Sequence, residues 1–402
     1  MEDLFVLFIF FLSIFLIFFR NLFGNIEPWK IMASAAFLLI ATDNITINQA
    51  IEQIDWSVIG FLYFMFVFSK GLEESGYLNN LLAEILSHFK KPFWIFCSFV
   101  FLVGVSSALL LNDTIAIIGS LSALLLAKIN NINPTPLIVA LVIAITIGSS
   151  ASPIGNPQNF IIASSDQFSG HNPFIIFFEY LAIPTIFSLG FLSLLLWYFF
   201  PSLQKLSKTP HKIPPISNDY KAAKIGFYTL ILLSVLRIFF NFPLFFIAFG
   251  VALIYLLLTP KKQNIFKADF KTLIFFIGMF ILMGSLFNTA AFKKFFSGKE
   301  NLSNPLTIIL SSLFFSQFLS NVPFVILYLK TANFLSINEL ILLAASSTLA
   351  ANITIFGGAS NIIVLQTIEQ NKIKFPLKEF VIFGISSTIF YFLFLLSIFK
   401  FL

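Results

Sequence analysis

Two short polar segments of this chain resemble each other, and each interrupts a long apolar stretch. Residues 148–159 read GSSASPIGNPQN, and residues 350–361 read AANITIFGGASN. Aligned without a gap, they match at three pairs, which are Gly155/Gly357, Asn159/Asn361 and the hydroxyl pair Ser152/Thr354. A helix broken by Gly, Pro and Asn at membrane depth is tolerated only where it is buried in protein or lines a cavity. Two such breaks at corresponding places in two halves of a chain indicate the binding site of a transporter.

The apolar stretches themselves place the chain in a membrane. Runs of about 17–25 apolar residues, the length that crosses a bilayer, recur along the whole sequence. Of the 402 residues, 58% are hydrophobic and 10% are charged, whereas soluble domains carry about 25% charged residues. The first run, 4–19, follows two acidic residues and no basic segment, so it is interpreted as a membrane helix rather than a cleaved signal. We therefore expect an integral membrane protein of a bacterial plasma (inner) membrane.

The apolar pattern predicts an all-α integral membrane fold with about ten spanning helices and two re-entrant hairpins. The hairpins are the apolar stretches 92–128 and 305–335, which have polar residues in their middles. Two of the spanning helices, 135–165 and 338–367, contain the polar segments and are predicted to be discontinuous. The other predicted spans are 4–20, 29–46, 54–70, 174–200, 224–241, 243–259, 271–290 and 378–401.

The two halves of the chain are predicted to be inverted repeats. Residues 1–200 form the first repeat and residues 225–402 form the second, joined by a linker at 201–224. The segments 55–66 and 269–280 both begin with Asp and share a Phe, a Met and a second Phe at matching positions. Each half has an odd number of spanning helices, five, so the second half lies upside down relative to the first. The alternative is chance similarity in a sequence of biased composition.

Lysines give the expected orientation. The linker 201–224 contains five Lys against the single acid Asp219, so this side is predicted to be cytoplasmic. Lysines near 261–271 and 372–378 fall on the same side in this arrangement. Both termini are then external, although the lysines at 293–299 also fall outside and oppose this orientation.

The tips of the two predicted hairpins carry polar side chains. The first tip contains Asn112, Asp113 and Thr114, and the second contains Ser320 and Asn321. Amide and hydroxyl oxygens are ligands that hard cations such as Na⁺ prefer, by extension from Ca²⁺ and Mg²⁺. Free N–H groups at half-helix N-termini suit an anion or a carboxylate. The tips and the breaks together therefore offer both kinds of group near the membrane midplane.

Asp113 is the carboxylate of these tips. A carboxylate at the membrane centre is costly and indicates function, so Asp113 is predicted to bind Na⁺ directly or to carry a proton. The alternative is that Asp113 caps the second helix of its hairpin, because Asp is a good N-cap. Its counterpart in the second hairpin is Val322, so a cation site is expected to be unequal between the halves.

For the two broken helices, the alternatives are a structural kink and a lining for substrate or ion. A kink alone does not require Asn159 and Asn361 at matching positions, which favours the lining. The candidate substrate- or ion-binding residues are Asn112, Asp113, Thr114, Ser152, Gly155, Asn156, Asn159, Ser320, Asn321, Asn352, Thr354, Gly357, Gly358 and Asn361, with Asp113 as the candidate Na⁺ or proton site.

Several function classes are not expected. The single Cys97 and three scattered His give no transition-metal site and no cluster of nucleophile and base, so an enzyme is not predicted. No phosphate-binding Gly loop indicates ATP use. No cofactor is expected beyond Na⁺ or H⁺ as the coupling ion. The net charge of +6 comes from loop lysines that meet lipid headgroups, so nucleic acid is not an expected partner.

The motifs together resemble the ion transporter superfamily, which includes citrate-transporter-like permeases, arsenite permeases, divalent anion:sodium symporters and NhaD-type Na⁺/H⁺ antiporters. The matching pieces are 112–114, 152–159, 320–323 and 349–361, and the resemblance is nearest to the arsenite-permease and citrate-transporter-like branch. It implies an inverted-repeat scaffold, often dimeric, with two hairpins and two unwound helices. It also implies an elevator-like movement of the hairpin domain against a scaffold domain.

The same resemblance implies roles for the hairpin tips. In the sodium-coupled branch, Ser-Asn-Thr tips line the Na⁺ and substrate sites. Here the first tip reads Asn-Asp-Thr at 112–114 and the second reads Ser-Asn-Val at 320–322, so neither triplet is complete.

The sequence thus predicts a secondary active transporter that moves a small anion, a carboxylate or an inorganic oxyanion, coupled to Na⁺ or H⁺. One alternative is a Na⁺/H⁺ antiporter with Asp113 as the exchanging carboxylate. Another is an arsenite efflux permease, which would need a partner ATPase for active drive. A channel is a further alternative, but paired broken helices favour a closed, alternating site. The expected partners are the bilayer, the small anion and a second copy of the chain in a homodimer.

Overall fold

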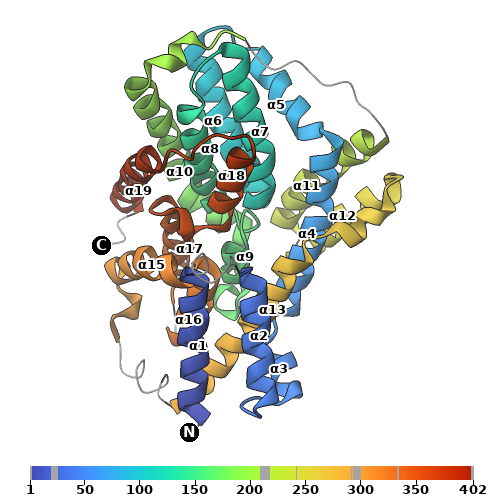
Figure 1. Ribbon diagram of the computed structural model, residues 1–402, viewed down its shortest axis with the longest axis vertical. Helices are drawn as coiled ribbons and strands as arrows, with labels where there is room; N and C mark the ends of the chain where they lie inside the picture. Colours follow the sequence, from blue (N-terminus) through green and yellow to red (C-terminus); the bar gives the residue numbers. More distant parts are fainter. Residues whose placement is uncertain are drawn as a thin grey trace.

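The chain folds into helices throughout the part that the structure, a computed structural model, describes (Figure 1). The described residues are 2–19, 26–208, 218–240, 242–290, 292, 300–332 and 335–399. The α-helices are α1 (Glu2–Phe18), α2 (Pro28–Ala41), α3 (Ile47–Gln53), α4 (Trp56–Ser75), α5 (Tyr77–Ser87), α6 (Pro92–Leu109), α7 (Asn112–Asn130), α8 (Thr135–Ser150), α9 (Pro157–Ser164), α10 (Pro173–Phe199), α11 (Asn218–Phe239), α12 (Phe245–Leu258), α13 (Phe270–Asn288), α15 (Pro305–Leu319), α16 (Asn321–Thr331), α17 (Ile337–Leu349), α18 (Ala359–Gln370) and α19 (Leu377–Phe399). Short 3₁₀ helices are η2 (Asp166–Phe168), η3 (Pro201–Lys205), η4 (Lys262–Lys267), η5 (Glu300–Ser303), η6 (Ala350–Asn352) and η7 (Ile355–Gly357).

Seven helices in the described part are long and apolar enough to cross a membrane, namely α4, α6, α7, α10, α11, α13 and α19. The first predicted hairpin, 92–128, consists of α6 and α7, and each of its arms is by itself long enough to span. The second, 305–335, consists of the shorter α15 and α16. The all-helical membrane fold is confirmed. The division into inverted repeats at 1–200 and 225–402 stays a prediction.

Two helices in the two halves begin in the same way. The Asp55 carboxylate accepts a hydrogen bond from the N–H of Ser57 at the start of α4 (3.0 Å). The Asp269 carboxylate accepts one from the N–H of Thr272 at the start of α13 (3.1 Å). Such caps satisfy amides that lack a partner within the helix. The two aspartates open the segments whose sequences match, so this match corresponds to the same local structure.

The packing of the helices repeats when the two halves exchange roles. α2 packs against α13, and α4 packs against α12. In the same way, α6 packs against α8 and α15 packs against α17. Contacts between the halves also exchange, because α7 lies against α18 and α9 lies against α16. A two-fold relation that matches α1, α2, α4 and α6–α10 with α11–α13 and α15–α19 accounts for these pairs of contacts.

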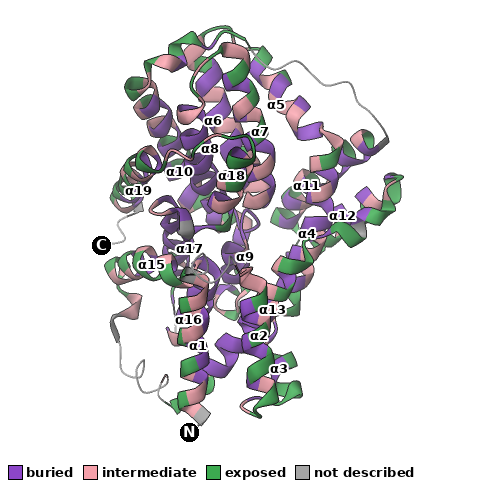
Figure 2. Cartoon of the chain, in the orientation of Figure 1, coloured by how far each residue is buried: buried purple, intermediate pink, exposed green. Residues whose placement is uncertain are grey.

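α8 and α17 form the centre of the molecule (Figure 2). Every residue from Pro136 to Ser150 in α8 is buried, and so is every residue from Leu340 to Leu349 in α17. Many large apolar side chains on the surrounding helices are exposed, as expected for surfaces that face lipid. Both polar segments follow directly on these two central helices, so both lie inside the protein.

Charged residues join the loop after α12 to the neighbouring helices. The buried Asp219 accepts a hydrogen bond from the Thr259 hydroxyl (2.5 Å) and pairs with the Lys261 ammonium (2.7 Å). Lys267 pairs with Glu74 at the end of α4 (3.0 Å). The hydrogen bond with Asp219 raises the pKa of Lys261 above its ordinary value, because it favours the charged ammonium.

Candidate functional site

The first break lies between α8 and α9 and is closed by the side chain of Asn159. Its amide Nδ2 donates to the carbonyl oxygens of Ser149 (3.1 Å) and Ser152 (3.0 Å), with Ser150 O at 3.4 Å. The Asn156 side chain caps α9, because its Oδ1 accepts from the N–H of Asn159 (2.8 Å). One side chain thus satisfies carbonyls that the interrupted helix leaves without partners, as burial requires.

The second break repeats this arrangement at the matching positions. Asn361 Nδ2 donates to the carbonyl oxygens of Ala351 (2.6 Å) and Thr354 (3.3 Å). In the aligned segments, Ala351 corresponds to Ser149 and Thr354 corresponds to Ser152. The likeness read from the sequence therefore reflects a common geometry, in which one asparagine ties the two ends of a broken helix.

Glycine is required at the centre of each break. A Cβ on Gly155 would lie 2.8 Å from the carbonyl oxygen of Ser149 and 2.9 Å from that of Ser107 on α6. A Cβ on Gly357 would lie 2.8 Å from the carbonyl oxygen of Ala350 and 2.9 Å from Oε1 of Gln317 on α15. Each glycine is therefore held against a backbone carbonyl oxygen of its own break, and at Gly155 also against a backbone carbonyl of the hairpin, at distances that a Cβ does not allow.

Thr348, at the end of α17, connects the second half of the chain to the first break. Its hydroxyl donates to Asn159 Oδ1 (3.1 Å) and accepts from Asn156 Nδ2 (3.2 Å). Gln158 Nε2 also lies 3.4 Å from this hydroxyl. The sequence analysis missed Thr348 and Gln158, although Thr348 directly precedes the second polar segment.

At the first hairpin tip, Asn112 is held by a serine one turn earlier. The Ser107 hydroxyl donates to Asn112 Oδ1 (2.8 Å) and lies equally close to the Ile145 carbonyl oxygen on α8. Thr114 is buried in the first turn of α7. The tip is thereby fixed to the central helix, and Ser107 is another residue that the sequence analysis did not single out.

Asp113 lies in the first turn of α7 and is partly exposed. The N-cap position of α7 is Leu111, and no side chain caps the helix, so the alternative in which Asp113 acts as the cap is not observed. Within the described part of the chain, no residue donates a hydrogen bond to its carboxylate. Asp113 is thus the charged group of the tip and is not bonded to either break.

The second hairpin tip has strained backbone and a different set of contacts. Ser320 has φ of 68°, in the left-handed range that residues other than glycine rarely adopt. Gln317, one turn earlier, donates from Nε2 to the Ala350 carbonyl oxygen (2.9 Å), and its Oε1 accepts from the Thr354 hydroxyl (2.7 Å). The hairpin is therefore tied to the second break through Gln317, which the sequence analysis also missed.

Two groups of predicted site residues result. The first break and first tip bring together Asn112, Ser152, Gly155, Asn156 and Asn159. The second break and second tip bring together Ser320, Asn321, Thr354, Gly357, Gly358 and Asn361. Asn352 is set apart, because its Cβ packs toward α19, 3.5 Å from where a Cβ on Gly384 would lie.

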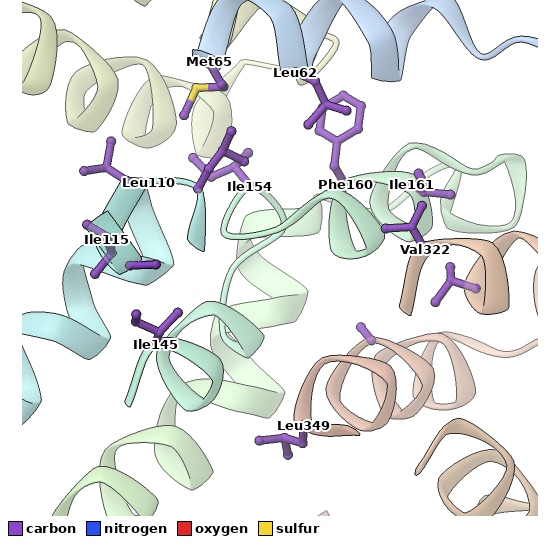
Figure 3. Packing of buried hydrophobic residues seen from close by; sticks show 14 of the residues in the cluster. Leu62, Met65, Leu110, Ile115, Ile145, Ile154, Phe160, Ile161, Val322 and Leu349 are labelled. Atoms are coloured by element: carbon purple, nitrogen blue, oxygen red, sulfur yellow. The ribbon is translucent and has the colours of Figure 1, made fainter. Parts of the chain in front are cut away.

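An apolar surface on α4 covers the first break and its tip (Figure 3). Leu62 of α4 lies beside Phe160 of α9, and Met65 of α4 lies on the side of Leu110 at the tip and Ile154 in the break. The ring of Phe160 stacks on Phe61 of α4, with centroids 4.0 Å apart. Buried apolar side chains of α4 thus pack against the first break.

The chemistry available at the site is that of neutral oxygens and N–H groups. No group of three or more His, Cys, Asp or Glu residues that could hold a metal ion occurs in the described part of the chain. Amide and hydroxyl oxygens suit a hard monovalent cation, and the N-termini of α9 and α18 suit an anionic oxygen. These groups have the chemistry that binding of a small ion requires.

Comparison with known proteins agrees with a transport site. The citrate transporter family matches this chain over residues 5–338. The chain belongs to the citrate transporter family. It is therefore an integral membrane solute transporter, and this family lies within the ion transporter superfamily that the motifs predicted.

Relatives of this citrate transporter family member cover different shares of it. Inner membrane protein YbiR of Escherichia coli (strain K12) is 28% identical over 279 residues, which are 69% of this chain and 72% of that protein. The silicon efflux transporter LSI3 of Oryza sativa subsp. japonica is 31% identical over 134 residues, 33% of this chain and 28% of that protein. Among solved structures, MtrF of Neisseria gonorrhoeae, from a class of antimetabolite efflux pumps, shares the fold with a TM-score of 0.58 at 12% identity, covering 90% of this chain and 83% of MtrF.

The citrate transporter family match includes the first break and both hairpin tips, and it ends before the second break at 350–361. The second break resembles the first in its structure, because in both an asparagine side chain donates to carbonyl oxygens at matching positions. The family match thus establishes the family of the chain, and the binding roles of the residues at the breaks and tips stay predictions.

Proposed function

We propose that this protein is a secondary active transporter that moves a small anion, a carboxylate or an inorganic oxyanion, coupled to Na⁺ or H⁺. The observation that carries the proposal is the pair of breaks in the buried centre, each tied by one asparagine to matching carbonyl oxygens. Such paired breaks mark the substrate site of transporters built from two related halves.

In this proposal the oxygen atoms and the N–H groups of the site bind different ions. The amide and hydroxyl oxygens of the breaks and tips bind Na⁺, while the N–H groups at the start of α18, which has no side-chain cap, bind an anionic oxygen. Asp113 supplies the negative charge at the first tip and binds Na⁺ or a proton. One charge that moves across a potential of 100 mV releases about 2.3 kcal/mol, which is enough to drive uptake against a gradient.

The helix packing supports an alternating site in the same proposal. The breaks lie where α8 and α17, one from each half, meet at the centre. α4 contacts the first break and α9 through buried apolar side chains, among them the stacked rings of Phe61 and Phe160, and in the proposal one side moves along the other at this contact. We also propose a homodimer, as the family resemblance implies, and no catalytic activity.

A Na⁺/H⁺ antiporter is the second candidate, and Asp113 is the observation that favours it. Asp113 is a partly exposed residue in the first turn of α7, and its carboxylate accepts no hydrogen bond from the described residues. A carboxylate in that state is able to exchange a proton for Na⁺. Efflux of an uncharged species such as arsenious acid remains the third candidate, and the similarity to a silicon efflux transporter makes silicic acid a second uncharged solute to test.

The first experiment uses the purified protein in liposomes that contain a pH-sensitive dye. A pulse of external NaCl, without any organic anion, is expected to leave the internal pH unchanged. Proton efflux on the pulse would instead establish the antiporter, and Asp113→Asn should then abolish it.

The second experiment measures uptake of labelled citrate, sulfate, arsenite and silicic acid with an inward Na⁺ gradient, an inward proton gradient or neither. We expect at least one anion to accumulate with one of the two gradients, and Asn361→Ala, which removes a buried amide oxygen without a described partner, to abolish this uptake. Gly190→Ala is the matched control, because no atom lies within 4 Å of the added Cβ. Uptake of only uncharged solutes, or uptake that ignores both gradients, contradicts the proposal.

A further inference from the structure

Four buried side chains near α19 have no hydrogen-bond partner among the described residues. Both amide atoms of Asn352 are in this state, and so are the hydroxyls of Ser188, Ser387 and Thr388. Each of these side chains belongs to a residue that is at most 3% exposed. Buried polar groups are almost always paired, so a cluster of unpaired ones calls for a ligand.

The helices that carry these hydroxyls do not themselves prevent pairing. Ser and Thr in membrane helices usually donate to a carbonyl of the preceding turn. Ser386 does so toward Ile382 O (2.8 Å), and Ser193 does so toward Leu189 O (2.8 Å). The adjacent Ser387 on α19 makes no such bond, so its hydroxyl is left available to a molecule other than its own helix.

The unpaired groups lie on one face of α19 and on the two elements that pack against α19, η6 and α10, and this set is called the stripe. A Cβ on Gly384 would lie 2.1 Å from the carbonyl oxygen of Asn352, so α19 touches the second break at this point. Ser387, Thr388 and Tyr391 follow Gly384 at helical spacings of three, four and seven residues and lie on the same face of α19. Seven residues of helix span about 10 Å, which is the length of the stripe.

The far end of the stripe reaches the first break. The hydroxyl of Tyr391 lies 3.1 Å from the Ser150 hydroxyl and 3.4 Å from that of Thr185 on α10. Ser150 occupies the position in the first break that Asn352 occupies in the second. Ser188 follows Thr185 by one turn on α10, which packs along α19 (Figure 1). The stripe therefore joins the backs of the two breaks.

The chemistry of the unpaired groups selects the ligand. Asn352 needs an acceptor for its N–H groups and a donor for its carbonyl oxygen, and each hydroxyl is able to act as either. A bare cation leaves the amide N–H groups unpaired, and an anion leaves the amide oxygen unpaired. Water satisfies both, and buried waters typically make about three hydrogen bonds to such groups.

We propose that a file of buried water molecules lies between the second break and α19, bound by Asn352, Ser387, Thr388 and Ser188, and ends at the hydroxyl cluster of Ser150, Thr185 and Tyr391. The file hydrates the second break from behind, so Asn352 keeps its hydrogen bonds whether or not an ion is bound in front. This site is separate from the proposed substrate site and does not depend on which solute is carried.

The test is radiolytic labelling of the full-length protein in detergent, without substrate, followed by mass spectrometry. Hydroxyl radicals formed from bound water oxidise the side chains that touch it. Tyr391 is 0% exposed, and so is Phe61, whose ring stacks on Phe160. If water lies along the stripe, Tyr391 is expected to be labelled at least about fivefold faster than Phe61.

A pair of variants locates the water. Ser387→Ala combined with Thr388→Val should lower the labelling of Tyr391 about threefold, because the file loses two of its ligands. Ser386→Ala is the matched control and should leave it unchanged, since that hydroxyl bonds to its own helix. Equal labelling of Tyr391 and Phe61 in the unmodified protein overturns the proposal even if the double variant does not fold. Unchanged labelling of Tyr391 in a folded double variant overturns it as well.

Discussion

The two breaks share one asparagine geometry but differ in how the rest of that asparagine is satisfied. In the first break, Asn159 Oδ1 accepts a hydrogen bond from Thr348 (3.1 Å). In the second, Asn361 Oδ1 is buried and has no partner in the described part of the chain. The threonine that corresponds to Thr348 is Thr146, which instead lies 3.3 Å from the Val142 carbonyl oxygen in its own helix.

The hairpin tips show the same difference. Ser107 donates to Asn112, five residues later, at the first tip. Ser316 and Asn321 have the same spacing at the second tip, yet the Ser316 hydroxyl and Asn321 Oδ1 are both buried without a described partner. The caps differ too, since Asn156 caps α9 whereas α18 begins at a glycine with no side-chain cap.

This comparison indicates that the two copies of the motif have different roles, one in stability and the other in binding. The first half closes its polar groups on one another, and therefore its residues are expected to contribute mainly to stability. The second half keeps oxygens that are free to meet an ion, and therefore its residues are expected to contribute mainly to transport. Paired substitutions at matching positions test this division directly.

Asn159→Ala is expected to have the largest effect on stability. It removes the hydrogen bonds that Asn159 donates to the carbonyls of Ser149 and Ser152 and the one that it accepts from the Thr348 hydroxyl, and each buried hydrogen bond lost in this way costs about 1–3 kcal/mol. We expect the free energy of unfolding in detergent to fall by about 3–5 kcal/mol, and by about half as much for Asn361→Ala. Equal losses for the two variants would remove the difference between the breaks.

The glycines test the part that the two breaks have in common. Gly155→Ala and Gly357→Ala each place a Cβ under 3 Å from a carbonyl oxygen, so both are expected to cost about 1–3 kcal/mol of unfolding free energy. Gly190→Ala, which meets no atom within 4 Å, serves as the control and should be neutral or slightly stabilising. A large loss of unfolding free energy for only one of the two variants would show that the two breaks differ in geometry in solution.

The threonines sharpen the comparison further. Thr348→Val keeps the shape of the side chain and removes its hydrogen bonds to Asn159 and Asn156, so we expect a loss of about 1–2 kcal/mol in unfolding free energy. Thr146→Val removes only a long bond to its own helix and should cost less than about 0.5 kcal/mol. A double-mutant cycle of Thr348→Val with Asn159→Ala should show coupling, and additive losses would contradict the bond.

The serines of the hairpins are expected to show a smaller contrast. Ser107→Ala removes the bond to Asn112 and should lower the unfolding free energy by about 1 kcal/mol. Ser316→Ala removes a hydroxyl that has no described partner and should be near neutral for stability. Ion-dependent uptake should respond in the opposite order. A Ser316→Ala variant with unaltered uptake would place the ion elsewhere.

The smallest expected effect is that of pH on the difference in stability between the Asn159→Ala and Asn361→Ala variants. Hydrogen bonds from Lys271 and Lys30 lower the pKa of Glu27, in the loop before α2, from 4.5 to about 2. Its contribution to stability is complete above about 4.5 and is lost as the pH falls through 2. The raised pKa of Lys261 acts at the other end, because its contribution is lost as the pH rises above 10.5. Between these limits, unfolding curves should show the same difference between Asn159→Ala and Asn361→Ala at every pH.

Local patterns were enough to predict the breaks. Gly155 and Asn159 contact backbone atoms of the same short segment, so their spacing is recognisable in the sequence. The same spacing recurs at Gly357 and Asn361. The same holds for Asp55 and Asp269, which cap the helices that follow them. The sequence prediction of two discontinuous helices agrees with the interruptions after α8 and α17.

Contacts across the fold could not be predicted in this way. The bond from Thr348 to Asn159 joins residues 189 positions apart, and a threonine in an apolar helix is indistinguishable in sequence from one that packs. Gln317 was missed for the same reason. The end of the predicted span 29–46 was also placed too late, because α2 ends at Ala41 and the turn before α3 includes Asp43 with φ of 54°. The roles assigned to the candidate site residues stay predictions.

The hydrogen bond from Thr348 to Asn159, which joins the two halves, has a counterpart that the structure does not form. Both members of each pair are present, since Thr146 matches Thr348 and Asn361 matches Asn159. The same four residues therefore also suffice for the reciprocal arrangement. In it, the Thr146 hydroxyl would donate to Asn361, and the Thr348 hydroxyl would donate to a carbonyl of its own helix. The structure holds one of these two bonds, and the unused pair is what an exchange of roles between the halves would require.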